Sequence, residues 1–190
     1  MFLCIKNAEV YAPKPLGRQD VLLCAERVIA IAPNIDTTGL PGEVQVLDAA
    51  GKRLLPGLID QHVHITGGGG ESGFTSRVPE LRFSQVIEAG VTTLVGLLGT
   101  DSRTRSVENL VAKAKALNEE GITAYCLTGA YAVPSPTLTG SVGGDIAFLS
   151  EVIGVKVAIS DHRSMCPTKE ELAKLAAEAR LAGLVCFPAS

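Results

Sequence analysis

A glycine followed by a short apolar, β-rich run recurs at nearly regular intervals along most of this chain. The spacings between successive glycines are 33, 31, 33 and 29 residues, for Gly57, Gly90, Gly121, Gly154 and Gly183. Patterns typical of amphipathic helices precede most of these glycines. Strands that alternate with helices at this interval predict parallel βα units. A period of about 30 residues is also what a barrel of eight βα units in ~250 residues requires.

Sequence signals also predict where the helices lie. The helix before Gly121 keeps one face apolar with Leu110, Val111, Ala114 and Leu117. The helix before Gly183 does the same with Leu172, Leu175, Ala176 and Ala179, and Thr168 with Glu171 fits a capping box at its start. We expect Pro79 in the first turn of the helix that ends near Gly90, and a shorter helix in 145–153. Each repeated glycine then stands where a helix end favours a left-handed residue.

Residues 1–55 follow a different pattern and predict a separate domain. Three short β-rich runs are separated by turns that contain Pro, Gly and Asn, with no helical pattern between them. We therefore expect a small, incomplete β-sandwich-type module of antiparallel strands at 1–55. Residues 56–190 are expected to form an α/β domain, a partial (β/α)8 TIM-like barrel with about four βα units. A doubly wound open sheet is the rival fold, but no GxGxxG follows the first strand.

Composition excludes several classes of protein. With 46% hydrophobic and 19% charged residues the chain predicts a globular, core-forming protein. The net charge of −3 and the lack of a basic patch argue against a nucleic-acid partner. No apolar run is long enough for a membrane span, and the N-terminus lacks the features of a secretory leader. The five cysteines are scattered and never form CxxC, which predicts reduced thiols in a cytoplasmic protein.

Two of the three histidines stand at alternate positions in one predicted strand. His62 and His64, in "GLIDQHVHI", would point to the same face, about 6.6 Å apart along the chain. Two imidazoles that converge in this way can share a metal ion. A pair of core histidines bonded to neighbouring groups explains the same pattern, because two ligands alone do not make a site.

Polar and glycine-rich residues follow the predicted strands, where the reactive face of a parallel barrel lies. These segments read "TGGGGESG", "GTDSRT", "TGAYAVPSPT" and "SDHRS". The glycine run before Glu71 is interpreted either as a flexible loop or as backbone N–H groups close to a ligand. Lys156 is interpreted either as an edge lysine that protects a strand from aggregation or as a lysine carboxylated by carbon dioxide. The predicted register places Lys156 early in its strand, whereas a ligand at the barrel mouth should come late.

Several motifs together resemble a known family. "LLPGLIDQHVH" looks like the first-strand signature of the amidohydrolase superfamily, metal-dependent hydrolases on βα barrels. "DQHVHITGGGGESG", "GVTTLVGLLGTDS", "ALNEEGITAYCLTGAYAVPS" and "VIGVKVAISDHRS" closely resemble the isoaspartyl dipeptidase family of that superfamily. The resemblance covers about residues 10–183 and implies the N-terminal half of such an enzyme, with the β module preceding the barrel.

The resemblance implies a binuclear zinc site. His62 and His64 would bind one zinc ion, and a carboxylated Lys156 would bridge both ions. The metals would lower the pKa of a bridging water, so that hydroxide is available near neutral pH. The reaction implied is hydrolysis of the isopeptide bond of a small β-aspartyl dipeptide, by an enzyme that is a homo-oligomer when complete.

The resemblance also implies substrate contacts. Gly69, Gly70 and Glu71 would hold the free aminoacyl end of the dipeptide, with Glu71 pairing with its ammonium. Thr100 would add a polar contact, and Arg163 would bind a carboxylate. Tyr131 would be catalytic, because it would polarise the scissile carbonyl. The neighbouring Asp161 and His162 receive no assignment.

The sequence also departs from the family pattern. The family supplies two more metal-binding histidines and a catalytic aspartate from later strands, whereas this sequence has only His162 as a further histidine and reaches Ser190 at the start of a fifth expected strand. We therefore expect little or no activity from the 190-residue chain alone. The alternatives are a catalytically inactive remnant or half-barrel, and another amidohydrolase such as a D-aminoacylase or cyclic amidase.

Overall fold

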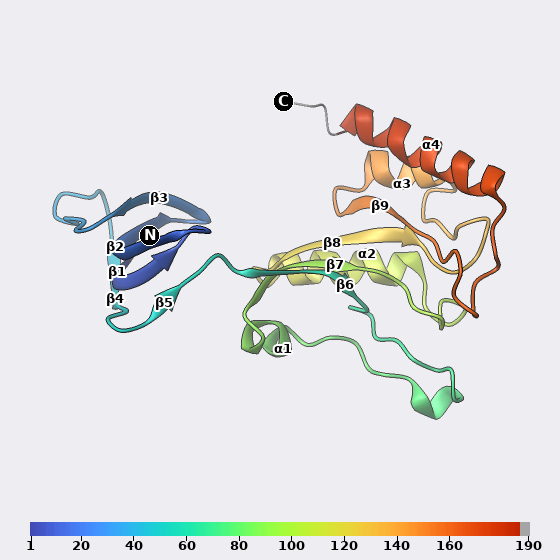
Figure 1. The fold of residues 1–190 in the computed structure, drawn as a ribbon, viewed down its shortest axis with the longest axis horizontal. Coiled ribbons are helices and arrows are strands. Elements are labelled where there is room, and N and C mark those ends of the chain that lie inside the picture. The colour runs from blue at the N-terminus through green and yellow to red at the C-terminus, as the bar shows by residue number, and fades with distance from the viewer. Residues whose placement is uncertain (187–190) are drawn as a thin grey trace. The chain divides into compact units, whose positions relative to one another are not determined.

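The computed structural model describes residues 1–186, which divide after Pro56 into two units (Figure 1). The first unit is Met1–Pro56, and the second begins at Gly57. The break falls one residue after the boundary drawn from the sequence. Each unit has its own buried residues and is described by itself.

The N-terminal unit is one mixed sheet in the order β3-β2-β1-β4, with β5 also paired to β1. Its strands are β1 (Phe2–Tyr11), β2 (Pro15–Cys24), β3 (Arg27–Ala32), β4 (Val44–Asp48) and β5 (Arg53–Leu54). The pairs β1–β2 and β2–β3 are antiparallel, as expected, but β4 and β5 run parallel to β1. The connection 33–43 explains the difference, because it is long enough to carry the chain across to the free side of β1.

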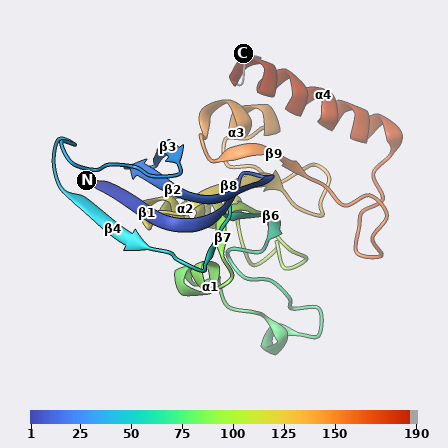
Figure 2. The same ribbon diagram turned by 60° about the vertical axis from the view of Figure 1, so that its left-hand side comes forward.

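The second unit is a four-stranded parallel sheet in the order β6-β7-β8-β9. Its strands are β6 (Leu58–Val63), β7 (Val91–Gly96), β8 (Thr123–Gly129) and β9 (Val152–Lys156). The helices are η1 (Phe74–Ser76), α1 (Phe83–Glu88), α2 (Val107–Glu119), α3 (Val142–Phe148) and α4 (Lys169–Cys186). Consecutive strands are neighbours, and Figures 1 and 2 show α3 and α4 side by side. This is the predicted α/β fold with part of a βα barrel.

Helix α2 supplies much of the core of the second unit. Its apolar face is buried, as the sequence pattern predicted, with Val107, Leu110, Val111, Ala114 and Leu117. The helix begins after Ser106, whose side chain accepts a hydrogen bond from the backbone N–H of Asn109. Gly121 follows the helix with φ of 99°, and Gly90 follows α1 with φ of 69°. Both values lie in the left-handed region, so these two glycines end their helices as expected.

The prediction for Pro79 was wrong, because α1 begins only at Phe83. The backbone between β6 and α1 is held in tertiary hydrogen bonds instead of a helical turn. The N–H of Val78 donates to the carbonyl of Gly68 at 2.8 Å, and that of Leu81 donates to Ile65 at 3.0 Å. The segment around Pro79 is held by these bonds in a conformation other than the expected first helical turn.

The predictions for Gly154 and Gly183 were also wrong. Gly154 lies inside β9, which begins at Val152, so the strand starts two residues earlier than expected. Gly183 lies inside α4, which continues to Cys186, and the rest of the expected fifth strand lies outside the described residues. A glycine costs a helix about 1 kcal/mol relative to alanine. Burial of Ala182 beside it, at 9% exposure, favours continuation of the helix.

Candidate active site

The C-terminal ends of the four parallel strands place most of the predicted site residues. His62 lies in β6 and His64 directly after it, and Thr100 follows β7. Tyr131 follows β8, and Lys156 is the last residue of β9. The earlier start of β9 moves Lys156 from the beginning of its strand to the end. The register conflict noted in the sequence therefore does not exist in the structure.

His62 and His64 lie beside each other with their ring centroids 5.7 Å apart. The Nδ1 atom of His64 lies 3.0 Å from the carbonyl oxygen of Leu97. Because a carbonyl can only accept, Nδ1 carries a proton in this contact, and in the neutral ring Nε2 then has a free lone pair. A Cβ atom at Gly68 or Gly99 would come within 3.3 Å of the His64 ring, so both glycines give this ring its space.

Lys156 is a half-buried lysine in contact with Tyr131. Its Nζ donates to the carbonyl of Leu98 at 2.8 Å and lies 3.6 Å from the centroid of the Tyr131 ring. Burial, followed by the positive charge of Arg163, lowers the pKa of Lys156 to about 8. A larger share of this amine is therefore uncharged near neutral pH than for an exposed lysine.

The predicted substrate contacts gather around one pocket of about 420 Å³. It is lined by Gly69, Gly70, Glu71, Thr100, Asp101, His162 and Arg163. Glu71 Oε1 accepts hydrogen bonds from Thr100 Oγ1 and from Arg163 Nη1, both at 2.8 Å. The hydrogen bond from Thr100, that from the backbone N–H of Glu71 and then the contacts of Arg163 hold the pKa of Glu71 below its usual value.

Asp161 fixes the direction of the Arg163 side chain, a role that the sequence reading left unassigned. Arg163 Nε and Nη2 donate to the two oxygens of Asp161 at 2.7 and 2.6 Å. These hydrogen bonds lower the pKa of Asp161 and raise that of Arg163. The sequence "DHR" did contain a signal for this contact, because an aspartate side chain often accepts a hydrogen bond from the backbone N–H two residues later. Asp161 Oδ1 accepts such a bond from the N–H of Arg163 at 2.9 Å.

Arg105 braces the glycine loop, and no sequence signal pointed to it. Its guanidinium donates to Asp101 Oδ2 at 2.5 Å, to the carbonyl of Val78 at 2.9 Å, and to the carbonyl of Thr66. Gly67 lies under this arginine with φ of 84°, and a Cβ there would come 2.2 Å from the Val78 carbonyl oxygen. The loop that carries Glu71 is thus tied to the residues after β7.

The ligands of a complete metal site are not gathered in residues 1–186. Within that range no three His, Cys, Asp or Glu side chains are placed to hold a metal ion. The donors present nevertheless fit one side of such a site, because His64 offers Nε2 and His62 lies beside it. Lys156 would add oxygen donors once carboxylated.

None of the helices in residues 1–186 is long and apolar enough to cross a membrane.

Two solved structures of one enzyme share about half of their aligned residues with this chain. No protein-family model matches it. The β-aspartyl dipeptidase of Fervidobacterium islandicum AW-1 is 51% identical, with a TM-score of 0.92 over 98% of this chain and 51% of that chain. The same enzyme crystallised with a β-Asp-Leu dipeptide gives a TM-score of 0.91 over 98% of this chain and 48% of that one. This chain therefore spans about half the length of that enzyme.

Curated relatives include dihydroorotases. That of Streptococcus thermophilus is 36% identical over 124 residues, which are 63% of this chain and 27% of that protein. A dihydropyrimidinase from Brevibacillus agri, at 23% identity and a TM-score of 0.66, shares the fold. The predicted resemblance is thus confirmed. The chain is related to the β-aspartyl dipeptidases of the amidohydrolase superfamily, and it matches about half the length of one of them.

Proposed function

We propose that this chain is part of a zinc-dependent hydrolase that cleaves β-aspartyl dipeptides. The observation that carries the proposal is the pairing of Glu71 with Arg163 in one pocket, next to Tyr131 and Lys156. A dipeptide has a free ammonium and free carboxylates, so it needs opposite charges close together. The relative that was crystallised with β-Asp-Leu supports the same substrate class.

The dipeptide would replace the ion pair between Glu71 and Arg163. Its ammonium would take the place of Arg163 beside Glu71 and Thr100, and its carboxylate would take the place of Glu71 beside Arg163. The pair is partly exposed, so water screens its charges and breaking it costs little. Asp161 would keep the guanidinium oriented throughout, while the N–H groups of Gly69 and Gly70 contact the aminoacyl end.

His62, His64 and a carboxylated Lys156 would hold the zinc ions. Carboxylation requires the uncharged amine, and the lowered pKa of Lys156 provides more of it. When bound, zinc supplies hydroxide near neutral pH by lowering the pKa of a coordinated water. The hydrogen bond to Leu97 keeps His64 in the tautomer that has Nε2 free. Tyr131, positioned against Lys156, would donate its hydroxyl proton in a hydrogen bond to the scissile carbonyl.

A chimaera tests the proposed function. Residues 1–186 of this chain are joined to the part of the Fervidobacterium islandicum enzyme that follows the matched segment, and leucine release from β-Asp-Leu is measured with zinc present. We expect hydrolysis that falls about a hundredfold in Arg163→Ala, because the dipeptide carboxylate loses a charged hydrogen bond. Cleavage of a β-aspartyl ester without that carboxylate should change far less. Equal losses on both substrates would contradict the role of Arg163, and a folded but inactive chimaera would favour the non-catalytic remnant.

A cyclic amide hydrolase is the second candidate, because the dihydroorotase of Streptococcus thermophilus is a 36% identical relative over part of the chain. The same chimaera assayed with dihydroorotate separates the two functions. We expect no turnover, since that ring has no ammonium for Glu71.

A cytoplasmic location and a homo-oligomeric state of the complete enzyme stay predictions.

A further inference from the structure

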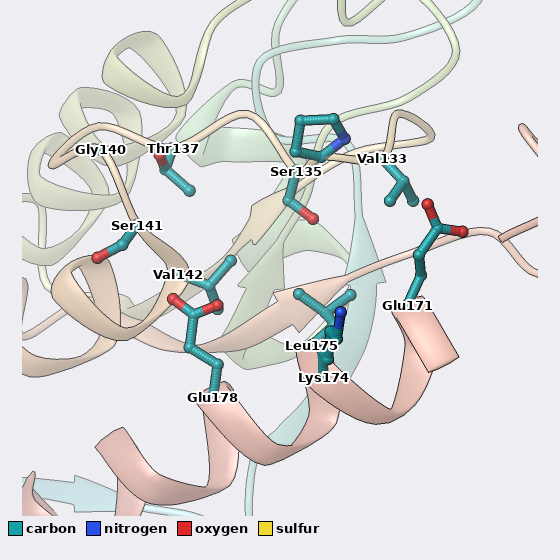
Figure 3. Close-up of a pocket in the computed structure, with 11 residues that line it drawn as sticks. Val133, Ser135, Thr137, Gly140, Ser141, Val142, Glu171, Lys174, Leu175 and Glu178 are labelled. Carbon is teal, nitrogen blue, oxygen red and sulfur yellow. The ribbon is translucent and has the colours of Figure 1, made fainter. Parts of the chain in front are cut away.

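A second pocket lies between the loop after β8 and helix α4 (Figure 3). Its volume is about 390 Å³, within the usual range for small-molecule sites. Val133 and Ser135 form the loop side, and the α4 side is formed by Glu171, Lys174, Leu175 and Glu178. The pocket shares no lining residue with the proposed active site.

The base of this pocket is apolar. Val142 is 4% exposed and belongs to the main core, and Leu175 packs against that core. Val133 adds a third aliphatic side chain from the loop. An aliphatic group placed here would be removed from water, which favours its binding.

Opposite charges border the apolar base without pairing among themselves. Lys174 stands three residues after Glu171 and four before Glu178, so all three lie on one face of α4 (Figure 3). In residues 1–186, none of the three forms an ion pair within 4.0 Å. Glu178 Oε1 accepts from the N–H of Gly143 at 2.8 Å, which fixes that carboxylate at the rim.

Ser135 places a buried hydroxyl on the opposite wall. Its Oγ is shielded from solvent and has no hydrogen-bond partner among the described residues. Figure 3 shows this oxygen directed from the loop toward α4. A ligand oxygen would reach this hydroxyl only after the Ser135 side chain turns toward the pocket, where the hydroxyl would gain the partner that it lacks.

We propose that this pocket binds a free α-amino acid with an aliphatic side chain. The ligand carboxylate accepts a hydrogen bond from Lys174, its ammonium donates to Glu178, and its side chain packs on Val142 and Leu175. Lys174 and Glu178 are separated by about 6 Å along the helix axis. One amino acid with hydrogen bonds of about 2.8 Å at each end spans that separation. The inference goes beyond the proposed function and does not depend on it.

Binding of L-leucine to the 190-residue chain tests the inference. The titration uses the Glu71→Gln and Leu184→Lys background, so that neither the proposed active site nor self-association through α4 supplies the signal, and follows the amide resonances of 133–142 and α4. We expect saturable shifts there, about tenfold weaker affinity in Lys174→Met, and unchanged affinity in Lys169→Met, which removes the same charge from α4 outside the pocket. Equal affinities in the two lysine variants, or no saturable shift, would overturn the proposal.

Ligand analogues test the same site in the unaltered pocket. Leucinamide lacks the carboxylate, and 4-methylpentanoate lacks the ammonium. Each should bind at least about tenfold more weakly than leucine, since each loses one charged contact. Binding of either analogue as tight as that of leucine would show that the charges on α4 do not recognise the ligand.

Discussion

Asp20 is the residue whose ionisation matters most to the N-terminal unit. Its carboxylate is 3% exposed and accepts hydrogen bonds from Lys6 Nζ at 2.8 Å and from the backbone N–H groups of Asn7 and Ile35, both at 2.9 Å. Burial alone would raise the pKa of Asp20, but these donors outweigh it and hold the pKa at about 2. The carboxylate is therefore ionised in the folded unit at pH values where an unfolded aspartate is protonated.

A pH dependence of stability follows for this unit. The folded pKa lies below the unfolded value of about 3.9, so the stabilisation is complete above pH 4 and is lost as the pH falls from about 4 to 2. Asp20→Asn should lower the urea midpoint of the unit at pH 7 and flatten its dependence between pH 4 and 2, followed by circular dichroism. Glu9→Gln, an exposed neighbour in the same sheet, is the matched control. An Asp20→Asn profile parallel to that of the unaltered protein would contradict this account.

The cysteines differ in predicted reactivity. Cys126 is fully buried in β8, and burial raises the pKa of its thiol to about 12, whereas Cys166 is exposed. Because the thiolate is the reactive form, iodoacetamide at pH 8 should modify Cys166 at least about a hundredfold faster than Cys126. Peptide mass spectrometry over time measures both rates. Comparable rates in the folded protein would contradict the burial of Cys126.

The sequence supplied part of the site at the level of single residues. Glu71, Thr100 and Arg163 came from motifs that resemble a family, and the structure brings them around one pocket. Asp161 was not assigned, although its contact with Arg163 is local in the sequence, whereas the partners of Arg105 are fixed only by the folded loops. Arg105 contacts Thr66, 39 positions earlier in the chain, and no local pattern encodes such a contact.

At the level of elements, the glycine loop between β6 and α1 depends on Arg105. Lysine keeps the positive charge but cannot donate to Asp101, Thr66 and Val78 at once. Arg105→Lys should therefore increase amide hydrogen exchange in residues 66–78 by about tenfold, measured by mass spectrometry. Arg103→Lys changes an exposed arginine two positions away and should leave exchange unchanged. Unaltered exchange in Arg105→Lys would show that the loop is held by other contacts.

Asp145 in α3 holds the end of the loop that begins after β8. Its side chain is fully buried and accepts hydrogen bonds from the N–H groups of Leu138 and Thr139 and from the hydroxyls of Thr128 and Thr139. Asp145→Ala leaves these donors unsatisfied and should lower the free energy of unfolding of the second unit by about 3 kcal/mol. Asp145→Asn keeps one acceptor and should cost less. Urea unfolding compares both with Glu119→Gln, an exposed control at the end of α2; a loss below about 1 kcal/mol in Asp145→Ala would contradict the role.

Element types were predictable from the sequence, but their ends were not. The alternation of apolar runs and helical patterns predicted β6 to β9 in parallel, because each run is short and β-rich. The start of β9 was misplaced, since Gly154 was taken as the end of a helix. Gly154 instead packs within the strand, where an added Cβ would lie 3.3 Å from the Leu127 side chain. Contacts of this kind come from the neighbouring strand and are invisible in a single segment.

At the scale of the whole molecule, the second unit exposes much apolar surface. Leu181, Leu184 and Val185 on α4 are 66%, 60% and 75% exposed, and Phe148 on α3 is 83% exposed. In the described part of the chain, β6 and β9 each pair with one strand only. Open strand edges next to apolar surface favour association with other chains.

The isolated 190-residue chain should therefore self-associate. Sedimentation velocity should show species larger than a monomer at micromolar concentration, and Leu184→Lys should shift the distribution toward monomer by placing a charge on the apolar surface. Ala177→Lys, at an exposed position on the same helix, serves as the control for added charge. A monomer in every variant would contradict this expectation.

The ion pair between Glu71 and Arg163 has a consequence for selectivity. Under the proposed function, each residue of the pair occupies the place of a ligand group beside the other, so a dipeptide that enters would separate them. A molecule with both charges restores two contacts for the one it breaks. A simple amine or a simple carboxylate restores one contact and leaves the other residue of the pair without a partner. Under the proposed function, a molecule that carries only one of the two charges should therefore bind more weakly than a dipeptide.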